Sequence, residues 1–396
     1  MTGDAIKPSM RSGARNPSDV ADNQLNEPPL SIGVRNPFVC AEHKSGKKID
    51  WDKMKLEEKK RTLAEAFEMP YERLFDPTKG SPLFVGDTRP CTLYPVNKWA
   101  PYPDVSSYVD TSVFYTDPVQ GVLPDCFFLA ALSSVAFVAP ILLPNQTTAP
   151  YSYTFNKLEG GKITSETVSG ISKNLPLDTN NQYRYSKSFT PSEIWVAMYE
   201  KAFAKWKNQA LGDKPDYALI CTGDPVLALL NLTGRKFSPY IPGTGLVENS
   251  TATRYSTTDF GTDAPTATTK IFNKIKNTAC KGMPKVQYPM VAYTYDPTKE
   301  TPPAGITYTD ATIVANHAYS VLGVYSVAPN TYIVMRNPWG QMGAGPGSGD
   351  PSGLPPGALA SGTWNGVNLS DASDAIFALK ADVFRDYFKG FGWVIQ

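Results

Sequence analysis

Apolar residues gather in a few segments along this chain, and the most apolar of these segments is residues 126–136. Almost every position in it is apolar or a good helix former, with no glycine or proline until Pro140. Gly121 and Pro124 precede the segment, so the chain turns and then enters a helix that begins at Cys126. Because the segment is apolar on all faces, we expect a buried helix inside the fold.

Weaker patterns predict the remaining elements. Helices are predicted over residues 51–69, from the capping box at 190–193 onward, over 225–234, over 268–279 and over 382–388. Strands are predicted over residues 288–295, 313–327, 332–337, 375–379 and 391–395. This mixture predicts an α+β fold, with helices in the first half and strands mainly in the second half.

Composition divides the chain into three parts. Residues 1–36 are polar and rich in Asn, Pro, Ser and Arg, so we expect a disordered N-terminal segment. Residues 235–267 are dense in Gly, Thr, Ser and Pro and predict a loop between two subdomains. We place the first subdomain at residues 37–240 and the second at residues 241–396.

Charge and cysteine usage limit the classes of partner. The formal net charge of +1 gives no reason to expect a nucleic acid or a membrane surface as partner. The N-terminus lacks an apolar signal core and no apolar run approaches membrane-spanning length, so no stable membrane association is expected. The cysteines are scattered and lack metal-ligand spacing: Cys40, Cys91, Cys126, Cys221 and Cys280. This pattern is typical of a reducing compartment, and we expect a cytoplasmic protein.

Cys126 differs from the other cysteines in its position. In the first turn of a helix, the unpaired backbone N–H groups and the helix dipole favour the thiolate over the thiol. Gln120 lies six residues upstream, and its side-chain amide can donate to an oxyanion beside the Cys126 N–H. A buried core cysteine is the alternative interpretation, and it would be the better one if Gln120 were absent.

A base for this thiol has to come from one of two histidines. His43 lies in a charged segment and is expected at the surface, whereas His317 lies in an apolar segment that predicts a buried strand. Asn337 ends the next predicted strand, immediately before Pro338. A hairpin of the two strands would set the Asn337 amide near the His317 ring. Cys, His and Asn in this order are the arrangement of papain-like thiol proteases.

Three blocks resemble the motifs of the calpain family of cysteine proteases: Gln120-Gly…Asp125-Cys126-Phe-Phe-Leu-Ala-Ala-Leu-Ser-Ser, Asn316-His317-Ala-Tyr-Ser-Val and Arg336-Asn337-Pro-Trp-Gly. The resemblance implies a papain-like core, in which a helical subdomain bearing the Cys packs against an antiparallel-sheet subdomain bearing the His and Asn. It implies Cys126 as nucleophile, His317 as base and acid, Asn337 as the residue that orients the His, and Gln120 as oxyanion donor. Trp339 of the third block is then expected to bind substrate or to gate the cleft.

The same resemblance implies a calcium-dependent endopeptidase that cleaves protein or peptide substrates through an acyl-enzyme. Asp117, nine residues before Cys126, matches an acidic calcium-binding position of the family, and Glu200 is its candidate partner. Gln341 and small residues follow the Trp-Gly pair, where calpains usually carry an acidic residue, so we expect one calcium site. The sequence contains no EF-hand loop, so we do not expect a small regulatory subunit.

Two other functions stay open. A catalytically inactive relative would use the same cleft as a binding or regulatory module, and Pro124 and Phe127 favour it slightly because the family usually has Gly and Trp there. An acyl transferase such as a transglutaminase also uses a Cys-His pair, but its usual third member is Asp. The intact Cys, His, Asn and Gln favour the protease.

Overall fold

In the computed structural model of this chain, residues Pro37–Gln396 form one compact unit. The described residues are 91, 93–102, 107–109, 112–159, 162–208, 212–234, 253–279, 283–299, 301–308, 313–340, 354–369 and 374–394. The predictions for residues 1–36, for the helix over 51–69 and for the subdomain boundary at 240 and 241 lie outside these residues. The division into two subdomains therefore stays a prediction.

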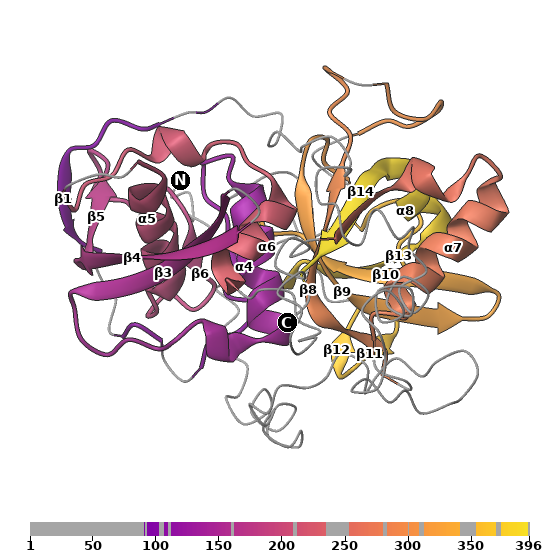
Figure 1. Cartoon of the computed structure of the whole chain (residues 1–396), viewed down its shortest axis with the longest axis horizontal. Helices are drawn as coiled ribbons and strands as arrows, with labels where there is room; N and C mark the ends of the chain where they lie inside the picture. Colours follow the sequence, from indigo (N-terminus) through magenta and orange to yellow (C-terminus); the bar gives the residue numbers. More distant parts are fainter. Residues whose placement is uncertain are drawn as a thin grey trace, which may run out of the picture. The chain divides into compact units, whose positions relative to one another are not determined.

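The first half combines helices with short antiparallel strand pairs. Its elements are β1 (Lys98–Pro101), β2 (Pro118–Val119), α4 (Cys126–Val138), η4 (Pro140–Leu142), β3 (Tyr151–Glu159), β4 (Lys162–Ile171), β5 (Asn174–Leu177), β6 (Lys187–Ser188), α5 (Trp195–Asn208), η5 (Tyr217–Ile220) and α6 (Pro225–Thr233). β1 pairs with β5, β2 with β6 and β3 with β4, each antiparallel. Figure 1 shows the pairs β1–β5 and β3–β4 near α5.

Helix α4 agrees with its prediction from the apolar pattern. It begins at Cys126, and every residue from Cys126 to Ala136 is buried. Its side chains pack in one hydrophobic core with those of α5 and α6. The ring of Phe128 stacks on the ring of Phe203 in α5, with centroids 4.1 Å apart. A helix that is apolar all round is stable only in such an interior, because each face then contacts protein.

The predicted capping box of α5 is wrong. Helix α5 begins at Trp195, and residues 190–193 form a turn in which the Glu193 N–H donates to the Thr190 carbonyl oxygen over 3.1 Å. The Glu193 carboxyl group lies beside Asp117. The C-terminus of α6 does follow its prediction, because Gly234 adopts the left-handed conformation, at φ 54°, and caps the helix.

The second half is organised around one antiparallel sheet of six strands. Its elements are β7 (Thr253–Ser256), η7 (Thr257–Phe260), α7 (Ala264–Lys276), β8 (Lys285–Thr294), β9 (Ala318–Val327), β10 (Asn330–Arg336), β11 (Thr363–Trp364), β12 (Val367–Asn368), β13 (Ile376–Lys380), α8 (Ala381–Tyr387) and β14 (Phe388–Trp393). The strand order is β13-β10-β9-β8-β14-β7. β9 and β10 form the predicted hairpin, with Asn330 opposite Val327.

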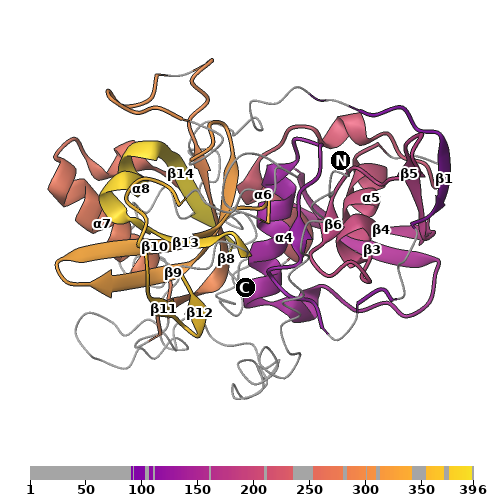
Figure 2. The same cartoon turned by 180° about the vertical axis from the view of Figure 1, so that it is seen from behind.

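The two faces of this sheet pack against different partners. On β8, Val291 and Tyr293 join the core that contains α4, whereas Met290 and Ala292 join the core that contains α7 and α8. This alternation follows from the strand period of two residues. Figures 1 and 2 show α4 and the pair α7–α8 on opposite sides of the sheet. The sheet is therefore covered on both faces, and its central strands β8 and β9 pack against the helix that begins at Cys126.

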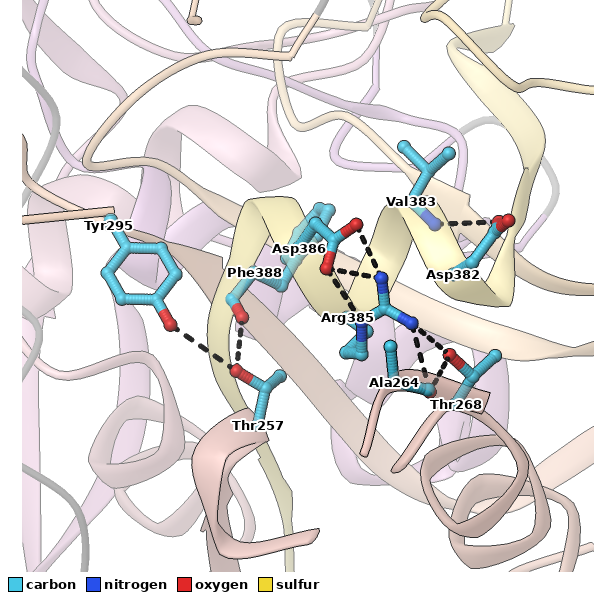
Figure 3. Close-up of polar contacts among 9 residues, drawn as sticks. All are labelled: Thr257, Ala264, Thr268, Tyr295, Asp382, Val383, Arg385, Asp386 and Phe388. Atoms are coloured by element: carbon cyan, nitrogen blue, oxygen red, sulfur yellow. Dashed lines mark hydrogen bonds and ion pairs between the residues drawn. The ribbon is translucent and has the colours of Figure 1, made fainter. Parts of the chain in front are cut away.

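Arg385 of α8 joins the two helices of the outer face (Figure 3). Its guanidinium donates to the Ala264 carbonyl oxygen over 3.0 Å and to the Thr268 hydroxyl over 2.6 Å, both at the start of α7. It also pairs with the neighbouring Asp386. Thr257, before α7, donates to the Phe388 carbonyl oxygen over 2.8 Å. These contacts join α8 to the start of α7 and join η7 to the start of β14.

Several predicted boundaries in this half differ from the structure. The loop predicted over 235–267 contains β7 and the start of α7, which begins at Ala264 because Asp263 caps it and Pro265 occupies its first turn. The strand predicted over 313–327 begins only at Ala318. Asn316 has a positive φ of 47°, which interrupts the extended conformation just before His317.

Cys91 and Cys221 form a disulfide bond that the cysteine spacing does not indicate. Their Cα atoms lie 5.5 Å apart, and the sequence separation is 130 residues. Gly223 in the same loop lies against Phe127, because a Cβ at this glycine would come within 2.3 Å of the Phe127 ring. The bond therefore fastens a loop that packs directly on the residue after Cys126. Among the described helices, none is long and apolar enough to span a bilayer.

Candidate active site

Cys126 is the first residue of α4 and is fully buried. The helix starts there because the Asp125 carbonyl oxygen accepts the backbone N–H groups of Phe128 and Leu129, over 2.9 and 3.2 Å. The Asp125 side chain makes no capping hydrogen bond. The Cys126 sulfur thus lies at the positive end of the helix dipole, which favours a thiolate.

His317 and Asn337 contact each other directly. His317 Nε2 lies 2.9 Å from Asn337 Oδ1, and both residues are buried. His317 sits immediately before β9 and Asn337 immediately after β10, so the β9–β10 hairpin brings them together. Because an amide oxygen only accepts, Nε2 carries the proton in this contact and Nδ1 carries the lone pair of the neutral ring.

The Asn337 side chain is held in place by its own turn. Its Oδ1 also accepts the Trp339 backbone N–H over 3.1 Å, and its backbone N–H donates to the Ala375 carbonyl oxygen over 3.0 Å. The buried Trp339 ring lies with its centroid 5.0 Å from the His317 ring. The indole thereby shields the imidazole and amide from water, which strengthens the hydrogen bond between them.

Side-chain hydrogen bonds fasten α4 to the sheet that carries His317. The Ser320 hydroxyl of β9 donates to the Ala130 carbonyl oxygen of α4 over 2.7 Å. The Ser134 hydroxyl of α4 donates to the Met290 carbonyl oxygen of β8 over 2.9 Å. Ser320 is three residues from His317, and Ala130 is four residues from Cys126. These bonds therefore fix the thiol-bearing helix relative to the imidazole-bearing strand.

Gln120 directly follows β2 and is 1% exposed. Its Nε2 donates to the Leu123 carbonyl oxygen over 2.6 Å. Because a carbonyl oxygen only accepts, this contact requires the nitrogen of the amide, and not its oxygen, to face Leu123. The amide nitrogen carries two hydrogens, so one N–H orients the group and the second can donate to an oxyanion. The Gln120 backbone N–H donates to the Pro338 carbonyl oxygen over 2.9 Å. Gln120 is thus attached to the residue that follows Asn337.

Arg336 begins the third motif block, but the sequence does not indicate its role in the site. It is fully buried, and its guanidinium donates to the carbonyl oxygens of Thr116 and Pro118 over 2.6 and 2.8 Å. Burial lowers its pKa to about 10, so it remains cationic at neutral pH. It ties the Asn337 turn to the segment that leads into Gln120. The sequence feature that could have identified Arg336 is a charged residue directly before Asn337 in an otherwise apolar strand.

Asp117, predicted as a calcium ligand, is buried beside Glu193. Its Oδ2 accepts the Phe114 backbone N–H and the Trp195 Nε1–H, each over 3.0 Å. Burial raises its pKa to about 6, although the Phe114 N–H, Trp195 and the Arg336 charge oppose this shift. Asp117 and Glu193 therefore form a pair of buried carboxyl groups, and sequence spacing did not identify Glu193 as the partner.

Glu200 occupies a different position. Its carboxyl oxygens accept the Tyr183 hydroxyl over 2.6 Å and the Ser186 backbone N–H over 3.1 and 3.2 Å. Its carboxyl group also hydrogen-bonds with Asp125, and burial raises its pKa. Two buried carboxyl groups in such contact repel when both are ionised, which favours protonation of one of them. Glu200 therefore supports the residue before Cys126 and makes no hydrogen bond with Asp117. In the described part of the chain, no three His, Cys, Asp or Glu side chains are grouped as a metal site.

Comparison with known proteins finds a matching family and two relatives. A model of the calpain family of cysteine proteases matches residues 98–351, which is more than half of the chain. A thiol protease of Porphyromonas gingivalis (strain ATCC BAA-308 / W83) is 29% identical over 296 residues, or 68% of this chain and 53% of the relative. Calpain clp-4 of Caenorhabditis elegans is 38% identical over 96 residues, or 22% of this chain and 13% of the relative. The chain thus spans about half the length of the bacterial relative.

Proposed function

Because this chain belongs to the calpain family of cysteine proteases, we propose that it hydrolyses peptide bonds of protein substrates with Cys126 as nucleophile. The observation that carries the proposal is the 2.9 Å contact between His317 Nε2 and Asn337 Oδ1. This contact fixes the ring and its tautomer, so that Nδ1 is the atom that takes and returns a proton. An Asn in this place also favours a protease over an acyl transferase with Asp as its third member.

The chemistry follows in two stages. His317 Nδ1 accepts the Cys126 thiol proton, and the thiolate attacks the scissile carbonyl carbon. The resulting oxyanion receives hydrogen bonds from the Cys126 backbone N–H and from the second N–H of the Gln120 amide. The imidazolium then gives its proton to the leaving amine as the C–N bond breaks, which leaves a thioester. Water, deprotonated by His317, hydrolyses this acyl-enzyme and restores the thiol.

We assign the two walls of the site to the two subdomains of a papain-like protease. The wall that bears Cys126 is built on α4, α5 and α6, which share one hydrophobic core. The wall that bears His317 and Asn337 is the six-stranded sheet with α7 and α8. Substrate would lie across the boundary between them, where Gln120 contacts Pro338.

We also propose one calcium ion at Asp117, with Glu193 as the facing carboxylate. Two buried carboxyl groups would supply part of a calcium donor set, because they repel when ionised and a divalent cation between them would remove this repulsion. Calcium would supply charge neutralisation and hold the segment from Asp117 to Gln120 against α5. Calorimetric titration of Cys126→Ala with calcium should show one binding event, and Asp117→Ala should remove it. Full activity in excess chelator would contradict this role.

Cleavage of an unstructured protein such as casein tests the proposed activity. Wild-type protein should degrade it, and Cys126→Ala of equal thermal stability should not. The alternative, an inactive relative that only binds peptides, would show binding without cleavage in both proteins. Cleavage that persists in Cys126→Ala would exclude Cys126 as the nucleophile.

A further inference from the structure

A pocket of about 290 Å³ opens beside the segment that carries Gln120. Its walls are formed by Tyr94, Pro95 and Val122 on the apolar side and by Asp178, Asn180 and Arg184 on the polar side. Val122 is two residues from Gln120, and its backbone N–H donates to the Arg184 carbonyl oxygen over 2.9 Å. The pocket therefore lies within reach of a peptide whose scissile carbonyl contacts Gln120, since an extended peptide advances by about 3.3 Å per residue.

The position of this pocket relative to Gln120 is rigid. A Cβ on Gly121 would come within 2.2 Å of the carbonyl oxygens of Arg184 and Tyr185, so the two backbones are in direct contact. The Tyr94 hydroxyl donates to the Pro176 carbonyl oxygen and accepts the Arg184 backbone N–H. Its ring lies 4.6 Å from the Tyr185 ring. A side chain bound in the pocket would thus be held at a fixed distance from the reacting bond.

The two charges in the pocket differ in what they can offer a ligand. Asp178 is used internally: its Oδ1 accepts the backbone N–H groups of Asn180 and Gln182, and its Oδ2 accepts Arg184 Nε over 2.7 Å. The pKa of Asp178 is lowered, mainly by the hydrogen bond from the Gln182 N–H, so the carboxylate stays ionised. The Asp178 side chain is 9% exposed, whereas the Arg184 side chain is 48% exposed.

Arg184 is therefore the charge that faces a ligand. A guanidinium has five N–H donors in a planar fork, and Asp178 engages the one at Nε. The terminal nitrogens form the edge that binds a carboxylate with two parallel hydrogen bonds. The rings of Tyr94 and Pro95 and the side chain of Val122 complement the methylene groups of an acidic side chain.

We propose that this pocket is a substrate subsite for an acidic side chain, Glu or Asp, within three residues of the cleaved bond. The proposal rests on the proposed protease function and adds a substrate class to it. Asp178 acts here as a positioning residue, because it orients the guanidinium through Nε and leaves the terminal nitrogens for the peptide.

Quenched fluorescent peptides that carry Glu, Gln or Lys at each of three positions on either side of the cleaved bond test this subsite. For wild-type protein, Glu should exceed Lys in kcat/KM by at least about tenfold at one position. Arg184→Gln should remove this preference, Arg184→Glu should reverse it toward Lys, and Arg184→Lys should retain part of it. Thermal midpoints of all variants show whether each is folded.

Lys187→Gln is the matched control. Lys187 is an exposed cation of β6 that pairs in register with Val119 and does not line the pocket. Lys187→Gln should keep the preference for Glu. If it loses this preference as much as Arg184→Gln does, the preference comes from diffuse positive charge and not from the pocket. If wild-type protein cleaves the peptides without any preference, the subsite is wrong while the protease function stands. If no peptide is cleaved, the protease function fails, and binding of the same peptides to Cys126→Ala then decides the subsite by the same charge preference.

Discussion

The backbone N–H of Gln120 donates to the carbonyl oxygen of Pro338 over 2.9 Å, across a sequence distance of more than two hundred residues. This one bond connects the residue that would stabilise the oxyanion to the turn that holds the imidazole. Gly340 closes the same turn at φ 72°, and a Cβ there would come within 2.6 Å of Val119. The proposed oxyanion donor, Gln120, and the turn that contacts the proposed base, His317, are therefore held against each other as well as by their own elements.

Removal of the Gln120 amide should affect the chemical step more than binding. Gln120→Ala should lower kcat by about 10²–10³ with little change in KM, because the amide acts on charge that develops in the transition state. Gln120→Glu, which keeps the shape but places a carboxylate near the oxyanion, should be at least as impaired. Steady-state kinetics with one peptide measures both effects. A change confined to KM would assign Gln120 to substrate binding instead.

The contact between Asn337 and His317 should matter more for activity than for folding. Asn337→Ala and His317→Ala should each lower kcat/KM by at least about 10², the usual contribution of a positioned general base. Asn337→Ala should also lower the free energy of unfolding by about 1–3 kcal/mol, because the Trp339 N–H loses its acceptor. His43→Ala is the control and should leave activity unchanged. Near-normal activity in either site variant would show that the triad assignment is wrong.

Glu200 should make stability depend on pH. Burial raises its pKa in the folded protein above the ordinary value of 4.5. The folded state then binds the proton more tightly than the unfolded state, so this group's contribution is greatest below pH 4.5 and is lost as pH rises through the folded pKa. The stability of wild type relative to Glu200→Gln should accordingly fall as pH increases from about 4.5 toward neutrality.

Chemical denaturation at a series of pH values measures this difference. Glu166→Gln provides a control of opposite sign, because Lys157 lowers the pKa of the exposed Glu166 and its contribution is lost as pH falls. A pH-independent difference between wild type and Glu200→Gln would contradict a Glu200 pKa that burial raises.

The disulfide should stabilise the protein. Closure of a 130-residue separation contributes up to roughly 5 kcal/mol in the chain-entropy treatment. In a Cys126→Ala background, a phosphine reductant should lower the thermal midpoint, and Cys221→Ser should lower it to the same extent and abolish the response. Equal midpoints with and without reductant would mean that Cys91 and Cys221 do not pair in solution. The cytoplasmic location expected from the cysteine pattern stays a prediction.

Local signals in the sequence were sufficient for parts of the fold and site. The continuous apolar run predicts α4 with Cys126 at its start, and the two strands before Asn337 predict the hairpin that places its side chain against His317. Both features depend on residues close in sequence, where apolar patterning and turn residues act directly.

The remaining features depend on contacts between distant residues. The local sequence predicts Glu193 in a capping box, but helix α5 begins at Trp195 and the Glu193 carboxyl group contacts Asp117 instead. Arg336 reaches carbonyl oxygens more than two hundred residues away, and no local pattern indicates which ones. No local pattern indicates the pairing of Cys91 with Cys221 either, because the two cysteines are 130 residues apart. Such pairings arise from the packing of elements whose relative positions a single sequence does not specify.

The most direct measurement of the central claim is the site of covalent capture by a peptidyl fluoromethyl ketone, which alkylates the nucleophile of a thiol protease after binding as a substrate. Mass spectrometry of the treated wild-type protein should find one adduct, mapped to Cys126, and loss of casein cleavage in proportion to its formation. His317→Ala should slow the labelling by at least about 10². Loss of cleavage with the adduct on another residue, or continued cleavage by protein fully labelled at Cys126, would contradict the assignment of Cys126 as the nucleophile.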